Sequence, residues 1–232
     1  MSRSKTTSIA SRMSSEEAVP RLVEATIRLL AEEGPAQIKA RSVADAAGVS
    51  TQALYYHLGG LPELLQAVID RGFGELGSAF AALTMTTDPV TDLFAMALTS
   101  RRLARENPHL YDAMFGLSTR GSYRVPHSPA PAPAARSAAF QAAYDQLVGA
   151  CRRLVEIGRV DPGVDAEVIA SQLWSAVHGF ITLELGGHLD QFHEPVRQVL
   201  EATTVNILVG LGDDRSTSKK SHDLAIEMLG IG

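Results

Sequence analysis

Apolar residues return at intervals of three and four along almost the whole chain, which is the spacing of one face of an α-helix. In the first such segment the spacing is carried by Val19, Leu22, Val23, Thr26, Ile27 and Leu30. The two-residue alternation of a β-strand and any internal repeat are both absent from the sequence. We therefore predict an all-α fold of about nine helices, over residues 16–33, 40–47, 51–58, 61–83, 88–106, 108–117, 136–158, 164–186 and 194–212.

Two segments interrupt the helical pattern. Residues 118–135 are rich in proline, glycine and serine, and we predict a long, poorly ordered loop there. Residues 213–221 are polar, and we predict a linker, followed over residues 222–229 by a last turn or two or by a frayed end.

The composition excludes several classes of protein. With 45% hydrophobic residues among 232, the chain can bury a core, yet no apolar run reaches the roughly 18 residues that a membrane span needs. The N-terminus is basic but lacks the apolar segment of a secretory signal. The single cysteine, Cys151, excludes an internal disulfide and argues against a thiolate metal site. We expect a cytoplasmic protein with no membrane segment, no metal and no cofactor.

Charge is distributed unevenly along the chain. The net charge is −5, yet residues 1–15 contain Arg3, Lys5 and Arg12 and no acidic residue. A basic end on an acidic chain is compatible with contact to nucleic acid at that end. Because this segment also lacks a helical pattern, we predict a disordered basic arm.

Residues 40–58 have the pattern of two short helices joined by a tight turn, the helix-turn-helix arrangement. Gly48 can adopt the left-handed conformation that the turn needs, and Ser50 can cap the second helix. Leu54 and Leu58 lie four residues apart, on one face that a small core would bury. The other side chains of this helix form an uncharged, hydrogen-bonding face that suits a DNA groove: Thr51, Gln52, Tyr55, Tyr56 and His57. The alternative is that the two tyrosines only pack between helices.

Three consecutive patterns carry a resemblance to a known family. R-L-V-E-A-T-I-R-L-L-A-E-E-G, then S-V-A-D-A-A-G-V-S-T-Q-A-L-Y-Y-H-L, then E-L-L, together within residues 18–68, resemble the N-terminal domain of the TetR family of bacterial transcriptional regulators. The rest of the chain is similar to the ligand-binding and dimerisation domain of that family in length and helix count. The resemblance implies four parts: a disordered basic arm (1–15), a helix-turn-helix DNA-binding domain (16–60), a ligand-binding and dimerisation domain (61–212) and a C-terminal tail (213–232).

The resemblance also implies which residues contact DNA. They are Arg41, Thr51, Gln52, Ala53, Tyr55, Tyr56 and His57. In the family, the positions of Thr51 and Gln52 read bases in the major groove. Those of Tyr55 and His57 contact phosphates, that of Tyr56 contacts base or backbone, and that of Arg41 contacts the flanking backbone. Two positions depart from the family pattern, since lysine is common where this chain has Leu61 and phenylalanine is usual at Leu58. The missing lysine should weaken the salt-dependent part of binding rather than abolish it, because amides at a helix start can still face a phosphate.

The pattern W-S-A-V-H-G at residues 174–179 resembles a Trp-x-x-x-His-Gly signature of some members of the family. Trp174 and His178 are four residues apart and share one helical face, so they are either a wall of a ligand pocket or a core packing pair whose ring N–H is satisfied. We take as candidate pocket residues Phe94, Leu98, Arg101, Met114, Phe115, Tyr144, Trp174 and His178.

The last two long helices carry more apolar positions than one helix stripe buries within a monomer. We therefore predict that they form a homodimer interface, an isologous four-helix contact. Its candidate residues are Phe180, Leu183, Leu200, Val205 and Leu208.

Other functions have weaker support in the sequence. There is no Gly-x-Ser-x-Gly elbow, no glycine-rich phosphate loop and no His-Glu-x-x-His motif, so we predict no catalytic residues and no enzyme activity. His188 and His193 do not have a recurrent metal-ligand spacing. A helical scaffold protein and a small helical enzyme stay as alternatives. The sequence favours a ligand-responsive, homodimeric repressor that binds a palindromic double-stranded DNA operator and a small-molecule effector.

Overall fold

The computed structural model describes residues 14–115 and 137–230, and every regular element within these ranges is helical. The predicted all-α class is therefore confirmed, with ten α-helices in the described ranges where we expected about nine. The predicted arm and the predicted loop over residues 118–135 fall outside the described ranges, except for the end of the arm at Ser14 and Ser15.

The chain divides into two compact units, one up to Val68 and one from Ile69 onward. The division falls inside helix α4 (Leu61–Ala81), which begins where we placed the start of the second domain.

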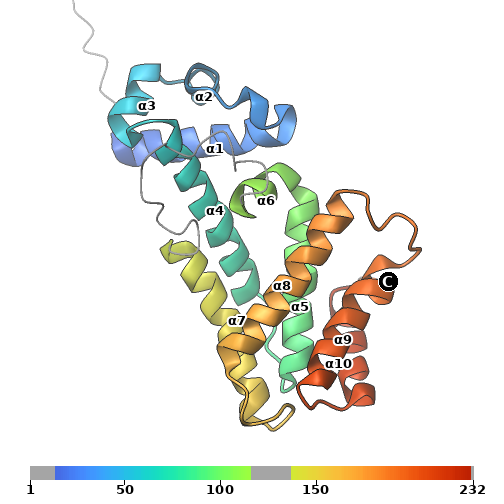
Figure 1. Ribbon diagram of the computed structural model, residues 1–232. Helices are drawn as coiled ribbons and strands as arrows, with labels where there is room; N and C mark the ends of the chain where they lie inside the picture. The colour runs from blue at the N-terminus through green and yellow to red at the C-terminus, as the bar shows by residue number, and fades with distance from the viewer. Residues whose placement is uncertain (1–13, 116–136, 231–232) are drawn as a thin grey trace, which may run out of the picture. The chain divides into compact units, whose positions relative to one another are not determined.

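The first unit is a bundle of three helices together with the start of α4 (Figure 1). Helix α1 (Ser15–Glu33) packs against both α2 (Ala40–Ala47) and α3 (Thr51–Leu58), and a short 3₁₀ turn (Pro35–Gln37) connects α1 to α2. Its core consists of fully buried aliphatic side chains from all four helices, among them Leu22, Val43, Leu54 and Leu64. The three-helix arrangement expected for the N-terminal domain is therefore present.

The second unit is built around α5 (Pro89–Glu106). This helix packs against α6 (Pro108–Phe115), α7 (Ala138–Glu156), α8 (Ala166–Leu185) and α10 (Arg215–Met228), while α9 (Ala202–Gly210) packs against α8 and α10. A helix that buries residues on most of its faces belongs at the centre of a bundle. Figure 1 shows α8 crossing α7 and α5, with α9 and α10 lying side by side. A π-helical segment (Val196–Glu201) leads into α9, where we had expected one continuous helix.

The segment expected to be a linker instead contains the first half of helix α10, so this prediction was wrong. Asp214 caps the helix, and its carboxylate accepts a hydrogen bond from the Thr217 amide at 2.8 Å. The buried face of α10 begins with Ser218, Ser221 and His222, which are small or polar. The apolar stripe that reveals a helix in a sequence is therefore missing from the first half of α10.

No helix in the described part of the chain is long and apolar enough to cross a membrane.

Candidate DNA-binding and ligand-binding sites

The turn between α2 and α3 has the geometry that its sequence predicts. Gly48 has φ 68° and ψ 32°, a left-handed conformation that glycine adopts without steric cost. Ser50 follows in an extended conformation, and its Oγ accepts a hydrogen bond from the Ala53 amide at 3.1 Å. This capping bond fixes the start of α3 and leaves its first turn oriented for contact with a partner.

Helix α3 is buried on one side and exposed to solvent on the other. Leu54 is fully buried, whereas Tyr55 and Tyr56 are 54% and 71% exposed and Gln52 is exposed. Both aromatic rings are thus more than half exposed and are not buried between the helices of this unit. The alternative that they only pack between helices is therefore not supported within this unit.

His57 is held by the start of α1. Its Nδ1 lies 2.7 Å from Oγ of Ser15, and the Tyr56 ring meets the His57 ring edge-on at a centroid distance of 4.9 Å. The other candidate contacts are less constrained. Thr51 and Ala53 are half-buried, and Arg41 is highly exposed, with Asp45 at 3.9 Å on the same helix. A pair this exposed contributes little to stability, so Arg41 is available to another partner.

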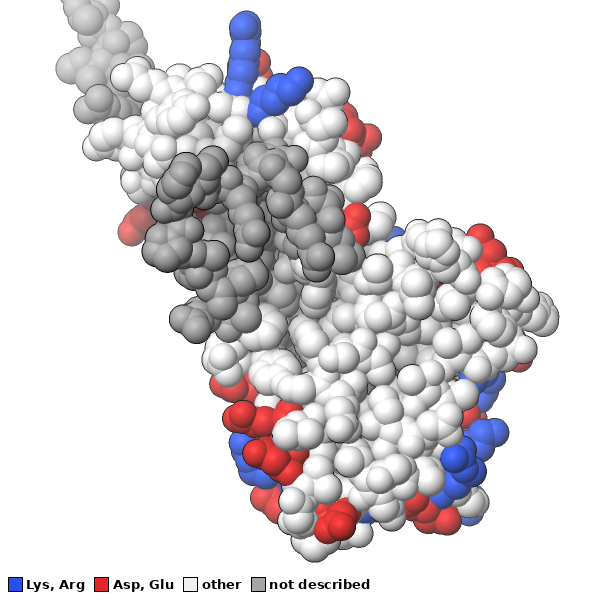
Figure 2. All heavy atoms as spheres, in the orientation of Figure 1, with Lys and Arg blue, Asp and Glu red and all other residues white. Residues whose placement is uncertain are grey.

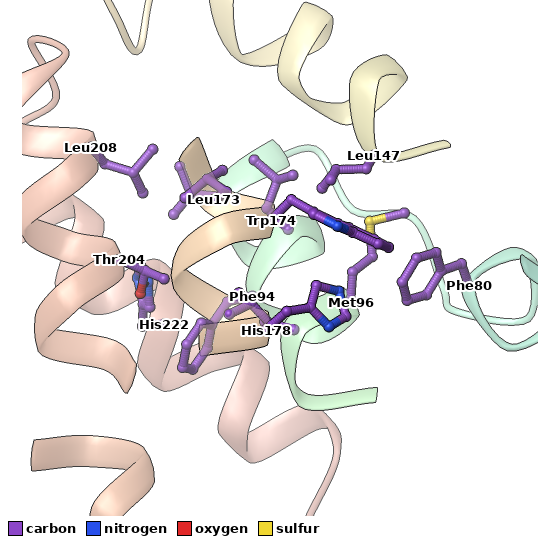
Figure 3. A pocket seen from close by; sticks show the side chains of 14 residues that line it. Phe80, Phe94, Met96, Leu147, Leu173, Trp174, His178, Thr204, Leu208 and His222 are labelled. Atoms are coloured by element: carbon purple, nitrogen blue, oxygen red, sulfur yellow. The ribbon is translucent and has the colours of Figure 1, made fainter. Parts of the chain in front are cut away.

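The second unit contains an apolar cavity of about 30 Å³ lined by α4, α5, α7, α8, α9 and α10 (Figure 3). Among the residues that the structure describes, no charged side chain lines it. Its lining includes Phe94 and Met96 of α5, Leu147 of α7, Trp174 and His178 of α8, and Leu208 of α9. Its polar end is formed by Thr204 and His222, whose Oγ1 and Nε2 lie 2.8 Å apart.

A second cavity of about 100 Å³ lies on the other side of His178, between α4, α5 and α6. Tyr111, Met114 and Phe115 line it together with Ser100, Asn107 and two glutamates, Glu75 and Glu106. His178 is the residue that lines both cavities.

The ring of His178 is enclosed by aromatic side chains. Ring centroids of Trp174 and Phe115 lie 4.0 and 4.2 Å from it, and Nδ1 lies 2.8 Å from the hydroxyl of Tyr111. Nε2 is buried and has no hydrogen-bond partner among the described residues. Burial lowers the pKa of His178 to about 3 and raises the pKa of Tyr111, so both groups are neutral near neutral pH.

Comparison with known families identifies both units. Residues 22–68 match the family described as bacterial regulatory proteins, tetR family, and residues 93–207 match the tetracyclin repressor-like C-terminal domain. The chain belongs to the TetR family of transcriptional regulators. It is thus a helix-turn-helix, DNA-binding regulator, and the N-terminal match includes the whole of α2 and α3.

Solved structures share this two-unit helical fold. A protein of unknown function from Rhodococcus sp. RHA1 is 26% identical with a TM-score of 0.68, and the match covers 89% of this chain and 100% of that one. RolR in complex with resorcinol is 18% identical with a TM-score of 0.62, covering 90% and 94%. SmeT, the repressor of the Stenotrophomonas maltophilia multidrug efflux pump SmeDEF, is 19% identical with a TM-score of 0.58, covering 86% and 90%. No curated protein sequence matches the chain.

In this TetR-family chain, the predicted pocket residues are distributed over three places. Phe94, Trp174 and His178 line the first cavity, and Met114, Phe115 and again His178 line the second. The remaining three line neither of these two cavities: Leu98, Arg101 and Tyr144. Leu98 and Arg101 border an open surface groove, where the Arg101 guanidinium pairs with both carboxylate oxygens of Glu184. Tyr144 lines neither cavity, and its hydroxyl lies 2.9 Å from Oγ of Ser171.

The polar cavity residues that sequence reasoning missed include Tyr111, Thr204 and His222. Tyr111 is 67 positions from its partner His178, and no local pattern connects the two. His222 was not identified because its segment, residues 222–229, was expected to form only a last turn or two or a frayed end. Its Nδ1 lies 2.7 Å from the carbonyl oxygen of Ser218, four residues earlier, which is a contact that only the helix creates.

Four of the five predicted dimer residues are buried within the single chain, so the reason given for them is wrong. Phe180, Leu200, Val205 and Leu208 are all at most 5% exposed. The additional apolar side chains of these helices pack against α5 and α10 or line the first cavity. Only Leu183, at 47% exposure, faces outward.

The described residues include no group of three or more His, Cys, Asp and Glu side chains close enough to hold a metal ion.

Proposed function

We propose that this chain is a ligand-responsive, homodimeric repressor that acts in the cytoplasm and binds a palindromic operator through α3. The observation that carries the proposal is the division of roles between the units. The first unit exposes Gln52, Tyr55 and Tyr56 on a capped helix, and the second unit holds an apolar cavity. Small-molecule sites are lined mainly by apolar side chains with a few polar groups, and the lining of this cavity has that character.

Residue roles on the DNA follow from the positions on α3. The first turn of the helix reaches base edges through Thr51, Gln52 and Ala53. The DNA backbone on either side is bound by Tyr55, Tyr56, His57 and Arg41. Without the family's lysine at position 61, phosphate contact at the start of α4 depends on the helix amides.

The outward faces of α8 and α9 support a dimer, in place of the buried positions that the sequence indicated. Most exposed residues along this face are uncharged, and Glu167 at the start of α8 is a charged exception. The uncharged ones are Val168, Ser171, Gln172, Ser175, Gly179 and Leu183 on α8, and Thr203, Asn206 and Gly210 on α9. Figure 2 shows few charged side chains over this part of the second unit and clusters of charge at its margins. A side chain at Gly179 or Gly210 would meet nothing within 4 Å, so a partner helix has room to approach the backbone there.

Regulation then requires that effector binding change the dimer. Helix α8 carries Trp174 and His178 on its inner face and the proposed contact residues on its outer face. A ligand that enlarges the cavity shifts α8 and thereby favours dimers whose α3 helices no longer match the spacing of the two half-sites. RolR with resorcinol and SmeT with triclosan are solved complexes with small molecules, which supports an effector of that size.

Selection of bound fragments from the source genome tests the proposal. We expect enrichment of short palindromic sites that the purified full chain retains in a mobility-shift assay, with half-sites about one helical turn apart. The matched control is the variant Tyr55→Ala with Tyr56→Ala, which should fold and lose retention because both side chains are exposed. Retention of random fragments without any shared sequence would contradict the proposal.

A further inference from the structure

One buried nitrogen atom in the second unit lacks, among the described residues, the hydrogen-bond partner that a buried polar atom normally has. Nε2 of His178 is buried, and no described residue offers it a hydrogen bond. The rings of Trp174 and Phe115 lie against the imidazole, at 4.0 and 4.2 Å, and the Tyr111 hydroxyl holds Nδ1, so the ring cannot turn Nε2 toward solvent. Buried polar groups in native proteins are usually paired, and an unpaired one therefore indicates a missing partner.

The chemistry of that partner follows from the neutral imidazole. A neutral ring donates from one nitrogen and accepts at the other, and which nitrogen carries the proton is not observed. If Tyr111 donates to Nδ1, Nε2 carries the hydrogen and needs an acceptor. If Nδ1 donates to Tyr111, Nε2 needs a donor. A hydroxyl group satisfies either case, whereas a carbonyl satisfies only the first.

The surroundings define the rest of the ligand. Within the described ranges, the first cavity has no charged lining residue, and the charged residues that line the second are both acidic, Glu75 and Glu106. The other polar pair of the first cavity, Thr204 and His222, is already hydrogen-bonded at 2.8 Å. A charged group buried there would lose its hydration without compensation. The cavities of about 30 and 100 Å³ meet at His178, and each is bordered by a flexible methionine, Met96 or Met114. An apolar cavity of about 150 Å³ holds one benzene ring, so a modest shift of these side chains makes room for a single ring.

We propose that the effector is a small, uncharged, mainly apolar molecule of about one ring whose hydroxyl group hydrogen-bonds Nε2 of His178. The inference rests on the proposed function, because it identifies the class of effector that the regulator binds. His178 is then the residue that selects the hydroxylated molecule over its apolar analogue, and Tyr111 positions it.

Three probes of similar shape test the inference on the purified full chain without DNA: phenol, toluene and benzoate. Trp174 is the only tryptophan in the sequence and contacts the His178 ring, so its fluorescence reports occupancy of the site, with calorimetry as a second measurement. The wild-type chain should bind phenol and should not bind benzoate near neutral pH. Its phenol-to-toluene affinity ratio is the reference for the variants.

The informative variant combines His178→Phe with Tyr111→Phe. Replacing both partners of a buried hydrogen bond by apolar groups of similar shape is nearly neutral for stability, whereas His178→Phe alone would take away one of the hydrogen-bond partners of the Tyr111 hydroxyl. We expect the phenol-to-toluene ratio to fall by roughly tenfold or more. Leu147→Met, in the lining of the same cavity, is the matched control: it changes shape without changing hydrogen bonding and should leave the ratio unaltered. In the wild type, NMR signals of the His178 ring nitrogens should shift with phenol and not with toluene.

An unchanged phenol-to-toluene affinity ratio in the paired variant would overturn the inference, and so would histidine NMR signals that do not respond to phenol. Either result would mean that Nε2 hydrogen-bonds to water or has no partner. Failure of the wild type to bind phenol at millimolar concentration would overturn it as well. Neither result touches the DNA test of the proposed function, which is measured without ligand, so the two failures are distinguishable.

Discussion

At the scale of single residues, we expect specific DNA binding to depend on one exposed side chain, that of Gln52. It lies in the first turn of α3, exposed, and its amide can form paired hydrogen bonds with the edge of an adenine. Gln52→Ala should weaken binding to the operator by roughly 1–3 kcal/mol. Binding to unrelated DNA should hardly change, because phosphate contacts supply it. Titration of both duplexes at one salt concentration measures the two effects, with Gln37→Ala, an exposed glutamine outside α3, as control. Equal losses on both duplexes would make Gln52 a backbone contact.

His178 makes stability depend on pH. Burial lowers its pKa from 6.5 to about 3 in the folded chain. Between these values the unfolded chain binds a proton that the folded chain does not, so the free energy of unfolding falls as the pH falls from about 6.5 toward about 3. The pKa of His222 is lowered as well, mainly by burial, and contributes in the same direction.

The paired variant His178→Phe with Tyr111→Phe isolates the His178 contribution. Urea unfolding at a series of pH values should give a free energy that declines less steeply in this variant, by up to about 1.4 kcal/mol per pH unit within the window. The carboxylates and His222 titrate in both proteins and cancel in the comparison. Parallel curves for the two proteins would show that His178 is already protonated, or solvated, in the folded chain.

At the scale of helices, those with an apolar stripe could be predicted from sequence, and those stabilised by polar contacts could not. The first unit was predictable because a glycine turn, a serine cap and Leu54 act within about ten residues of one another. The first half of α10 was not, because Ser218 and Ser221 occupy its buried face. The cavity could be predicted only in part. Trp174 and His178 share one helix, whereas the partner of His178 comes from α6 and is determined by tertiary packing.

Polar contacts also hold α10 in place, and Arg159 is central to them. Its guanidinium binds the carboxylates of Asp88, which caps α5, and of Asp213, which precedes α10, each at 2.8 Å. Hydrogen bonding to Asp213 raises the pKa of Arg159. The Ser221 hydroxyl of α10 donates to the same Asp88. One arginine thus joins the start of α5 to the start of α10.

Arg159→Met should lower the free energy of unfolding by about 3 kcal/mol, because it leaves the buried Asp213 without its counter-charge. The value lies at the low end for a broken buried ion pair, since Arg159 is partly exposed. Urea unfolding measures it, and Arg152→Met, on the exposed side of α7, serves as control with little expected effect. A loss as small as that of the control would mean that α10 is held by its apolar contacts alone.

For the whole molecule, α8 has two roles that cannot be separated. Its inner face supplies the tryptophan and histidine of the cavity, and its outer face supplies Val168 and Leu183 to the proposed dimer contact. A change in cavity volume can therefore reach the partner subunit through one rigid element, without a chain of intermediate residues. This arrangement predicts that variants of the outer face impair DNA binding although α3 is untouched.

The paired substitution Val168→Glu with Leu183→Glu tests this prediction. Both side chains are about half exposed in the single chain, so the change should leave each subunit folded while like charges oppose each other across an isologous contact. We expect sedimentation at micromolar concentration to show monomers. Operator affinity should fall toward the non-specific level, because one α3 reads too few base pairs for specific binding. Met85→Glu, which replaces an apolar side chain that is even more exposed and belongs to neither α8 nor α9, should stay dimeric and bind normally. A monomeric wild type that still binds a palindrome tightly would rule out the dimer, and a charged variant that remains dimeric would place the interface on another face.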